Sequence, residues 1–203
     1  MTHRLAVLVS GTGRHLENLA RLAQEGRADF DAEVALVISN RDGVLALERA
    51  ARFDLPTVVL KGEPGETDEA YGARAFDAIR DAGVDTVVLA GFLKKLWIPA
   101  DYAGRVINIH PSLLPAFGGK GYYGDRVHRA VLERGVQVTG CTVHLVDEVY
   151  DNGPILLQRW CAVEPDDTVE TLAHRVFEEE LVALPEGLRR LWAERGHPAS
   201  GPA

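Results

Sequence analysis

The 203-residue sequence is poor in cysteine. Its two cysteines, Cys141 and Cys161, lie far apart, with no Cys-x-x-Cys pair and no cluster of His and Cys. A disulfide framework or a structural zinc site requires sets of closely spaced ligands. The sequence therefore indicates neither, and we expect no bound metal. Isolated thiols are typical of a reducing compartment, so we expect a cytoplasmic protein.

Long hydrophobic runs are also missing. A helix that crosses a bilayer needs about 20 consecutive apolar residues, and no segment of this sequence provides them. The run from Leu5 to Val9 follows Arg4 as in a signal peptide, but it is too short, and Ser10–Gly13 indicates a turn rather than a cleavage region. We expect neither a membrane span nor a leader.

Positive charge is in deficit. Lys and Arg number 22 against 30 Asp and Glu, which gives a formal net charge of -8 and a pI of about 5.4. A chain of this charge repels polyanions, so we expect no nucleic acid and no membrane as a partner. A local site for a small phosphate group, and a homodimer, are both compatible with this composition.

The sequence does contain an alternation of short apolar runs and amphipathic stretches. The β-rich runs are Arg4–Val9, Glu33–Ser39, Thr57–Leu60 and Thr86–Ala90, and the helix-period stretches are Leu16–Glu25, Leu45–Phe53 and Asp68–Ala82. This alternation predicts an α/β fold, with a doubly wound, mainly parallel sheet and helices on both faces.

The second half predicts fewer but longer elements. They are a strand at Val106–His110, a loop at Phe117–Gly124, a helix at Asp125–Glu133, strands at Thr139–Val146 and Pro154–Val163, and a helix from Val169 that we expect to kink or break at Pro185. The length of the chain predicts a single domain over residues 1–203. Residues 196–203 are expected to form a flexible tail.

Two polar side chains end the predicted strand Val106–His110. Strand alternation places Asn108 and His110 on the same side. In doubly wound sheets ligands collect at the carboxyl ends of strands. An amide and an imidazole there can both donate hydrogen bonds to an oxygen that becomes anionic when an amine adds to a carbonyl. An Asn that caps a turn above a packed His would leave the same two-residue pattern.

A carboxylate and a glycine turn complete the candidate chemistry. Asp151 stands in an acidic loop that the Asn152–Gly153 turn closes, where it would favour a protonated imidazole. Ser10–Gly13 joins the first strand to the first helix, where free N–H groups and the helix dipole favour phosphate. This turn lacks the full spacing of a dinucleotide fingerprint and of a P-loop, and such turns also serve merely to join a strand to a helix.

These segments together resemble the phosphoribosylglycinamide formyltransferases, a family within the folate-dependent formyltransferase superfamily. The resemblance covers nearly the whole chain and rests on Ser10–Gly13, Ile38–Asn40, Ala90–Phe92, the string Asn108–Pro115, Val143–His144 and Asp151–Pro154. It implies transfer of formyl from 10-formyltetrahydrofolate, as co-substrate, to the amine of glycinamide ribonucleotide in purine biosynthesis. The motifs specify the superfamily more sharply than the acceptor.

The resemblance also implies residue roles. Asn108 would hold the formyl oxygen, His110 would donate the proton, and Asp151 would favour the protonated His110 and relay a proton through water. The acceptor would bind at Gly11, Thr12, Gly13, Arg14, His15, Leu16 and Glu180. The folate would bind at Leu93, Lys94, Lys95, Leu96, Asn108 and Asp147.

The sequence departs from the family pattern in three places. Arg14-His15 stand where relatives usually have Ser-Asn, Asp68 stands where many carry an arginine near the folate tail, and the Phe117–Gly124 loop is longer than in the shortest relatives. We therefore carry no folate-tail contact over to Asp68. The glycines of the loop would suit a mobile lid, although a flexible surface loop explains them equally.

Two other classes of function fit part of the pattern. One is formyl transfer or hydrolysis on another substrate, such as methionyl-tRNA, formyl-folate or an amino sugar nucleotide. The acidic charge opposes tRNA, and we expect the first two to need a further domain. The other is a phosphate-binding module without catalysis, which would use the glycine turn but has no use for Asn108, His110 and Asp151 together.

Overall fold

The computed structural model describes residues 2–26 and 28–196 and divides the chain into two compact units. The first unit is built from the chain up to Asn108 together with Leu145–Glu148. The second is built from Ile109–His144 and the chain from Val149 onward. Seven strands are hydrogen-bonded in the order β3-β2-β1-β4-β5-β6-β7, so the predicted α/β fold with a mainly parallel sheet is confirmed.

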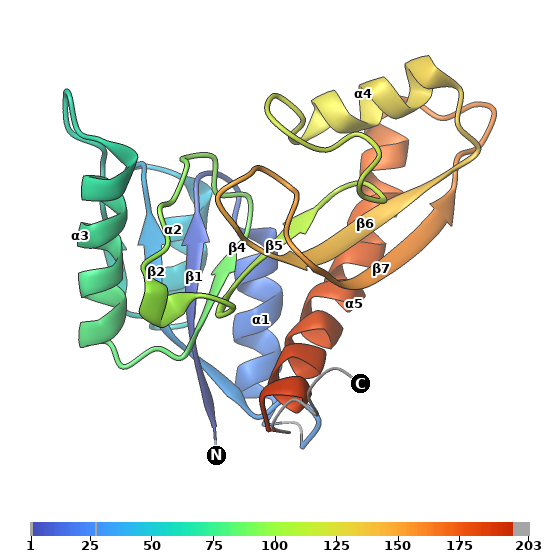
Figure 1. The fold of residues 1–203 in the computed structure, drawn as a ribbon. Coiled ribbons are helices and arrows are strands. Elements are labelled where there is room, and N and C mark those ends of the chain that lie inside the picture. The colour runs from blue at the N-terminus through green and yellow to red at the C-terminus, as the bar shows by residue number, and fades with distance from the viewer. Residues whose placement is uncertain (1, 27, 197–203) are drawn as a thin grey trace, which may run out of the picture. The chain divides into compact units, whose positions relative to one another are not determined.

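The strands of the first unit are parallel wherever they pair (Figure 1). They are β1 (His3–Val9), β2 (Ala32–Ser39), β3 (Thr57–Val59), β4 (Thr86–Leu89) and the first part of β5 (Val106–His110). The helices are α1 (Arg14–Gln24), α2 (Leu45–Arg52) and α3 (Asp68–Asp81), with a 3-10 turn, η1, at Ala100–Tyr102. Continuous apolar runs such as β1, whose last five residues are buried, are what a sheet covered on both faces requires.

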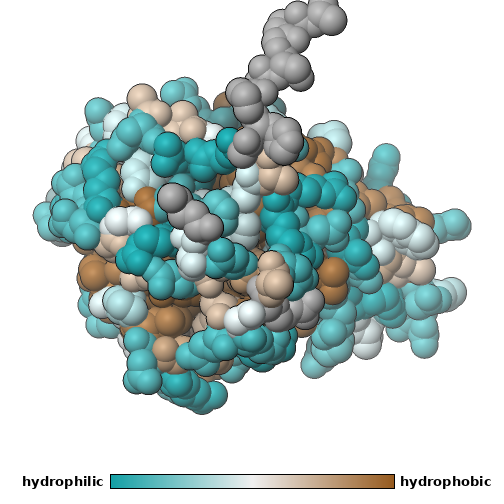
Figure 2. Space-filling view, turned by 90° about the horizontal axis from the view of Figure 1, so that it is seen from below, coloured by the Kyte–Doolittle hydropathy of each residue, from teal (hydrophilic) through white to brown (hydrophobic). Residues whose placement is uncertain are grey.

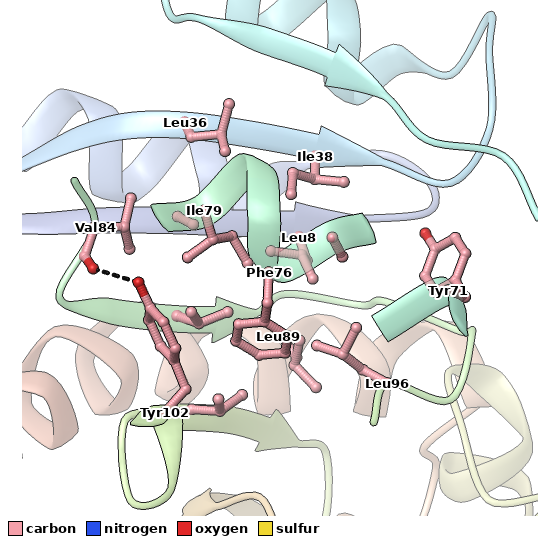
Figure 3. Packing of buried hydrophobic residues seen from close by; sticks show 14 residues of the cluster. Leu8, Leu36, Ile38, Tyr71, Phe76, Ile79, Val84, Leu89, Leu96 and Tyr102 are labelled. Atoms are coloured by element: carbon pink, nitrogen blue, oxygen red, sulfur yellow. Dashed lines mark hydrogen bonds between the residues drawn. The ribbon is translucent and has the colours of Figure 1, made fainter. Parts of the chain in front are cut away.

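A core cluster joins α3 to the sheet of this unit. Phe76 and Ile79 of α3 are fully buried against Leu8 and Leu36 of the strands, as Figure 3 shows. The one polar group that Figure 3 connects is the hydroxyl of Tyr102, which donates a 2.8 Å hydrogen bond to the carbonyl of Val84. Because buried polar groups need partners, this bond lets η1 close the cluster without an unpaired hydroxyl.

The second unit is built around a hairpin. Strands β6 (Val138–Leu145) and β7 (Ile155–Ala162) pair antiparallel, and helices α4 (Asp125–Arg134) and α5 (Val169–Gly196) belong to the same unit. Helix α5 approaches β6 closely, because a Cβ at Gly187 would lie only 2.6 Å from Cγ1 of Val143. Cys141 of β6 and Cys161 of β7 are both buried free thiols, and burial raises the pKa of each.

Most predicted elements lie within two residues of their observed bounds, and Val106–His110 coincides with β5. Of the kink or break expected at Pro185, a break does not occur, because α5 continues from Val169 to Gly196 with Pro185 inside it. The predicted tail starts at Gly196, which is the last residue of α5, and its remainder lies outside the described residues. No pattern in the sequence indicates η1.

The surface in Figure 2 is mainly hydrophilic, with smaller apolar areas between the polar residues. This agrees with a composition in which 26% of residues are charged. Over the described part of the chain, none of the helices combines the length and apolar character that a membrane span needs.

Candidate active site

Strand β5 carries the two side chains that the sequence placed together. Asn108 and His110 both lie in the strand, so alternation directs them to one side, as predicted. The imidazole of His110 is only 4% exposed, whereas Asn108 is half-buried. A buried imidazole forms few hydrogen bonds with water, so its protonation depends on the protein groups around it.

Two histidines flank the carboxylate of Asp151 inside the second unit. Nδ1 of His110 lies 3.4 Å from Oδ2 of Asp151, and Nε2 of His144 lies 3.7 Å from Oδ1. The backbone N–H of Gly119 donates a 2.8 Å hydrogen bond to Oδ2. The structure thus brings His110 and Asp151 together, and it adds His144, which was assigned no role from the sequence.

The environment of Asp151 favours its ionised form. Burial on its own would raise the pKa of this carboxyl, but the hydrogen bond from His144, the charge of His110 and the N–H of Gly119 outweigh burial. The net effect holds the pKa of Asp151 below its ordinary value. A carboxylate that is charged at neutral pH then stabilises a positive charge on the neighbouring ring.

Hydrogen bonds of the hairpin hold the segment that follows β5. The hydroxyl of Thr142 donates to the carbonyl of Ser112 at 2.7 Å and accepts from the N–H of Leu114 at 3.0 Å. The side-chain amide of Gln158 donates to the carbonyl of Leu114 at 2.9 Å. These bonds fix the backbone directly after His110, which limits how far the imidazole can move.

The glycine turn of the first unit lies at the point where the strand order reverses. Strand β1 pairs with β2 on one side and β4 on the other, and ligands of doubly wound sheets bind outside the carboxyl ends at such a point. The hydroxyl of Ser10, after β1, accepts a 2.9 Å hydrogen bond from the N–H of Leu93, after β4. The predicted acceptor turn and the start of the predicted folate segment are therefore neighbours.

The predicted acceptor residues of the turn differ in their surroundings. Gly11 and Thr12 are exposed, as is Arg14, the first residue of α1. Gly13 is buried and His15 is half-buried. Leu16 is fully buried in the core, so its side chain serves packing. The exposed backbone of the turn, together with the start of an 11-residue helix, is suited to bind an anion.

The predicted folate residues also divide into two kinds. Leu93 is 48% exposed and Lys95 is exposed, while the Nζ of Lys94 lies 4.5 Å from the centre of the Tyr71 ring. Leu96, in contrast, belongs to the core cluster of α3. Asp147 is exposed in the loop after β6. Leu96 therefore serves the packing of the core. The exposed Leu93, Lys95 and Asp147 are accessible to a ligand.

Glu180 is buried, unlike its two acidic neighbours. Glu178 is exposed, Glu179 pairs with Arg159 at 2.6 Å, and Glu180 is only 7% exposed. The sequence offered a signal for this, because Val176, Phe177 and Leu184 are buried at helical spacing from Glu180. A carboxylate on the buried stripe of a helix requires a specific partner.

His128 of α4 was not predicted. It is 4% exposed, and its Nδ1 is buried without a hydrogen-bond partner among the described residues. Burial lowers the pKa of this imidazole, while the charge of Glu180 acts in the opposite direction. The available signal was its place beside Val127 and Val131 on the apolar face of the predicted helix. A single histidine on such a face more often only packs.

The chemistry of this arrangement is that of proton transfer next to an oxygen. An imidazole beside a carboxylate with a lowered pKa can supply a proton to an oxyanion, and a half-buried carboxamide such as that of Asn108 can donate a hydrogen bond to one. Within the described ranges, no group of three or more His, Cys, Asp or Glu side chains is arranged to hold a metal ion.

Comparison with known proteins gives matches over nearly the whole chain. The model of the formyl transferase family matches residues 3–188. The chain is 40% identical over 190 residues to the trifunctional purine biosynthetic protein adenosine-3 of Drosophila melanogaster, which covers 93% of this chain and 14% of that protein. It is 41% identical over 182 residues to the chloroplastic phosphoribosylglycinamide formyltransferase of Arabidopsis thaliana. This alignment covers 87% of this chain and 61% of that protein.

Solved structures agree. The crystal structure of glycinamide ribonucleotide transformylase 1 from Symbiobacterium toebii superposes with a TM-score of 0.87 at 39% identity, covering 98% of this chain and 92% of that one. The chain spans only part of the two curated relatives, 14% and 61% of their lengths. On the match to residues 3–188 and on these likenesses, the chain belongs to the formyl transferase family.

Proposed function

We propose that this protein transfers the formyl group of 10-formyltetrahydrofolate to the amine of glycinamide ribonucleotide, as a step of purine biosynthesis. The observation that carries the proposal is the buried contact of His110 with Asp151, 3.4 Å apart, at the end of the strand that also holds Asn108. The names of the relatives, which include phosphoribosylglycinamide formyltransferase, support the choice of acceptor.

The chemistry follows from the charge that the reaction develops. When the neutral amine attacks the formyl carbon, the carbonyl oxygen becomes an oxyanion, and catalysis requires donors that act where this charge appears. The carboxamide of Asn108 would donate one hydrogen bond, and the protonated imidazole of His110 would donate a second. Asp151, charged because its pKa is lowered, would stabilise the imidazolium and help to return its proton through water.

Substrate contacts are proposed for each unit by itself. In the first unit, the phosphate of the acceptor would bind the backbone of Gly11–Gly13 and the side chain of Arg14, since Gly11, Thr12 and Arg14 are exposed at the start of α1. The folate would bind beside Leu93–Lys95, the accessible part of the predicted folate segment, with Asp147 as a further contact. In the second unit, buried Glu180 would accept hydrogen bonds from the glycinamide.

The compartment is part of the same proposal. Both cysteines of the chain are free thiols, which suits a reducing environment such as the cytoplasm. The relative from Arabidopsis thaliana is named as chloroplastic, so fractionation of the native organism's cells is the measurement that decides.

The first test is turnover with purified protein. Incubation with 10-formyltetrahydrofolate and a panel of amines, including glycinamide ribonucleotide, amino sugar nucleotides and methionyl-tRNA, should release tetrahydrofolate with glycinamide ribonucleotide alone. Release with another amine would reassign the acceptor. Binding of a phosphate compound without turnover of any amine would instead favour the non-catalytic module.

The second test assigns the catalytic residues by kcat against pH. Asn108→Ala should lower kcat by about 10²–10³-fold, the usual loss of one oxyanion donor, and leave folate binding largely intact. His110→Ala should lower kcat at least as much, and Asp151→Asn should lower the profile and move it toward acid. The matched control is His174→Ala, since His174 is exposed on α5, where it pairs with Glu178. An unshifted, full-height profile for Asp151→Asn would remove Asp151 from the mechanism.

A further inference from the structure

The first residues of the Phe117–Gly124 loop contact the catalytic pair with their backbone. The carbonyl oxygen of Phe117 lies 2.9 Å from Nε2 of His110. The N–H of Gly119 donates to Oδ2 of Asp151 at 2.8 Å. Between them, Gly118 leaves no room for a side chain, since a Cβ there would overlap Leu114 and lie 3.3 Å from Cβ of Asp151. The loop therefore presses its main chain directly against the two side chains.

The contact with Phe117 determines which ring nitrogen of His110 carries hydrogen. A carbonyl oxygen can only accept a hydrogen bond, so Nε2 must be the donor. In the neutral ring, the second nitrogen, Nδ1, then holds a lone pair. Nδ1 is the atom that lies 3.4 Å from Asp151. An additional proton can therefore enter and leave the ring only at Nδ1.

The backbone at this contact adopts a costly conformation. Of the residues that the structure describes, three that are not glycine have a positive φ, and two of them are Phe117 at 55° and Asp151 at 56°. An aspartate tolerates the left-handed region, but a bulky aromatic residue rarely occupies it. Such strain persists where surrounding contacts impose it, and it gathers at functional sites. Here it accompanies the carbonyl that meets the imidazole.

We propose that Phe117 is a positioning residue whose main-chain carbonyl fixes the Nε2–H form of His110, so that Nδ1 is the nitrogen that gives its proton to the formyl oxygen. This inference rests on the proposed function. The Gly119 N–H complements it, because a bond to Oδ2 holds the carboxylate of Asp151 beside Nδ1. A loop that only covered the site would not need to contact both partners of the proton transfer.

The proton steps balance as follows. The amine nitrogen forms a bond to the formyl carbon, the π electrons of the carbonyl move to oxygen, and this oxygen takes the proton of Nδ1. The ring is then neutral and keeps its Nε2 proton. When the bond from carbon to N10 of the folate breaks, the carbonyl reforms and returns its proton to Nδ1. The proton that the amine loses ends on N10, so tetrahydrofolate leaves as the neutral amine.

The direct test is ¹⁵N NMR of the protein labelled in its histidine rings, with His110→Gln to assign the signals. We expect Nε2 of His110 to stay protonated across the titration, while Nδ1 alone gains a proton as the pH falls. A neutral ring protonated at Nδ1 would overturn the proposal. Because this measurement needs no substrate, its result stands even if turnover with glycinamide ribonucleotide is not found.

A kinetic test uses two variants that each keep one donor position. The amide nitrogen of His110→Asn can take the place of Nδ1, and that of His110→Gln can take the place of Nε2. We expect kcat of His110→Asn to be at least about tenfold higher than that of His110→Gln, with both independent of pH where wild type titrates. The reverse order would assign the reaction to Nε2. Circular dichroism of each variant checks its folding.

The role of Phe117 is tested by a pair that differs in backbone freedom. Phe117→Gly accepts a positive φ without strain, whereas Phe117→Val opposes it because valine is β-branched. Both variants lose the aromatic ring, so packing losses are shared. We expect Phe117→Val to have a kcat about tenfold below that of Phe117→Gly, with similar KM values for both substrates, and a mixture of His110 tautomers by NMR. Equal kcat values with an unchanged tautomer would contradict a positioning role.

Discussion

Gly11 and Gly13 occupy the same turn but do different things. Gly13 has a φ of 73°, and a Cβ there would lie 2.6 Å from Cβ of Ala46 at the start of α2. Gly11 has no positive φ and no atom within 4 Å of the place where its Cβ would be. Gly13 is therefore required for the packing of α1 against α2. Gly11 leaves open the side of the turn that a phosphate would use.

This difference makes Gly11→Val the informative change at the turn. We expect it to raise the KM for glycinamide ribonucleotide at least about tenfold and to leave the KM for folate and the melting temperature nearly unchanged. Gly13→Ala should instead destabilise the whole protein by about 1–3 kcal/mol, seen in urea unfolding. Steady-state kinetics that show an unaltered acceptor KM for Gly11→Val would exclude phosphate binding at this turn.

His128 gives the protein a pH dependence of its own. Burial lowers the pKa of this ring below 6.5 in the folded state, so the unfolded chain binds the proton more readily. The contribution of His128 to the free energy of unfolding is fully present above pH 6.5, the pKa of the unfolded chain. This contribution decreases as the pH falls from 6.5 toward the lower pKa of the folded state. Each pKa unit of difference is equivalent to about 1.4 kcal/mol.

The corresponding prediction compares two histidine variants. We expect wild type to lose unfolding free energy between pH 7 and pH 5, and His128→Asn to lose less, because the replaced group no longer titrates. His174→Asn, which changes an exposed histidine, should retain the wild-type slope. Urea unfolding at several pH values measures this. Identical slopes for His128→Asn and wild type would show that the ring is not held neutral.

At the scale of elements, α5 and β6 approach each other closely at Gly187. A methyl group at Gly187 would lie 2.6 Å from Cγ1 of Val143. Alanine favours a helix over glycine by up to about 1 kcal/mol, but forcing extra volume into a packed contact costs about 1–3 kcal/mol. Overpacking is the larger effect, so the glycine is retained for proximity rather than for flexibility.

A double-mutant cycle tests this contact. We expect Gly187→Ala to destabilise the protein by about 1–2 kcal/mol, and Val143→Ala by roughly 2 kcal/mol through the cavity it leaves. In the double variant, the loss of unfolding free energy should be about 1 kcal/mol smaller than the sum of the two single losses. The smaller side chain at position 143 makes room for the added methyl group at position 187. Additive losses in urea unfolding would mean that α5 shifts away from β6 instead.

The elements themselves were largely predictable, because each has a clear period and a clear end signal. The start of α5 is one case: the helix was expected from Val169, and the hydroxyl of the preceding Thr168 accepts a 3.2 Å hydrogen bond from the N–H of Thr171. Asp167 beside it is bound by Arg175, which lowers the pKa of the carboxyl to about 2. Pro185 does not end α5, because proline removes one hydrogen bond locally, whereas packing along the 28 residues of α5 acts over the whole helix.

The candidate site was predictable in part. Strand alternation was enough to pair Asn108 with His110, and the acidic loop supplied Asp151. The positions of His144 and His128 around this pair depend on how β6 and α4 pack, which no local pattern specifies. The carbonyl of Phe117 and the N–H of Gly119 were beyond prediction for a different reason: backbone groups are the same at every residue, so only the fold shows which of them meet the imidazole and carboxylate.

At the scale of the whole molecule, the acidic charge opposes the proposed substrates, which are themselves anions. A net charge of -8 repels a ribonucleotide phosphate and a folate carboxylate at long range, where ionic screening is effective. Local groups such as Arg14 and Lys94 must therefore provide the attraction at short range.

The reactivity of the two buried thiols measures how often the second unit opens. Cys141 and Cys161 lie on paired strands, β6 and β7, and the first unit has no cysteine. A thiol reagent added to the native protein can react only when this hairpin separates from its cover, so labelling rates measure native-state opening without any engineered probe. Burial also raises the pKa of both thiols, which slows reaction further by reducing the thiolate.

We therefore expect both thiols to react at least about 10³-fold more slowly than in the denatured chain, and at similar rates, as read separately in Cys141→Ser and Cys161→Ser. A Cys161 that reacts more than about tenfold faster than Cys141 would show that β7 frays alone. Saturating folate or glycinamide ribonucleotide should slow the labelling if either binds the closed hairpin more tightly than the open one. The same two sulfur atoms would then serve as a binding assay that requires no catalysis.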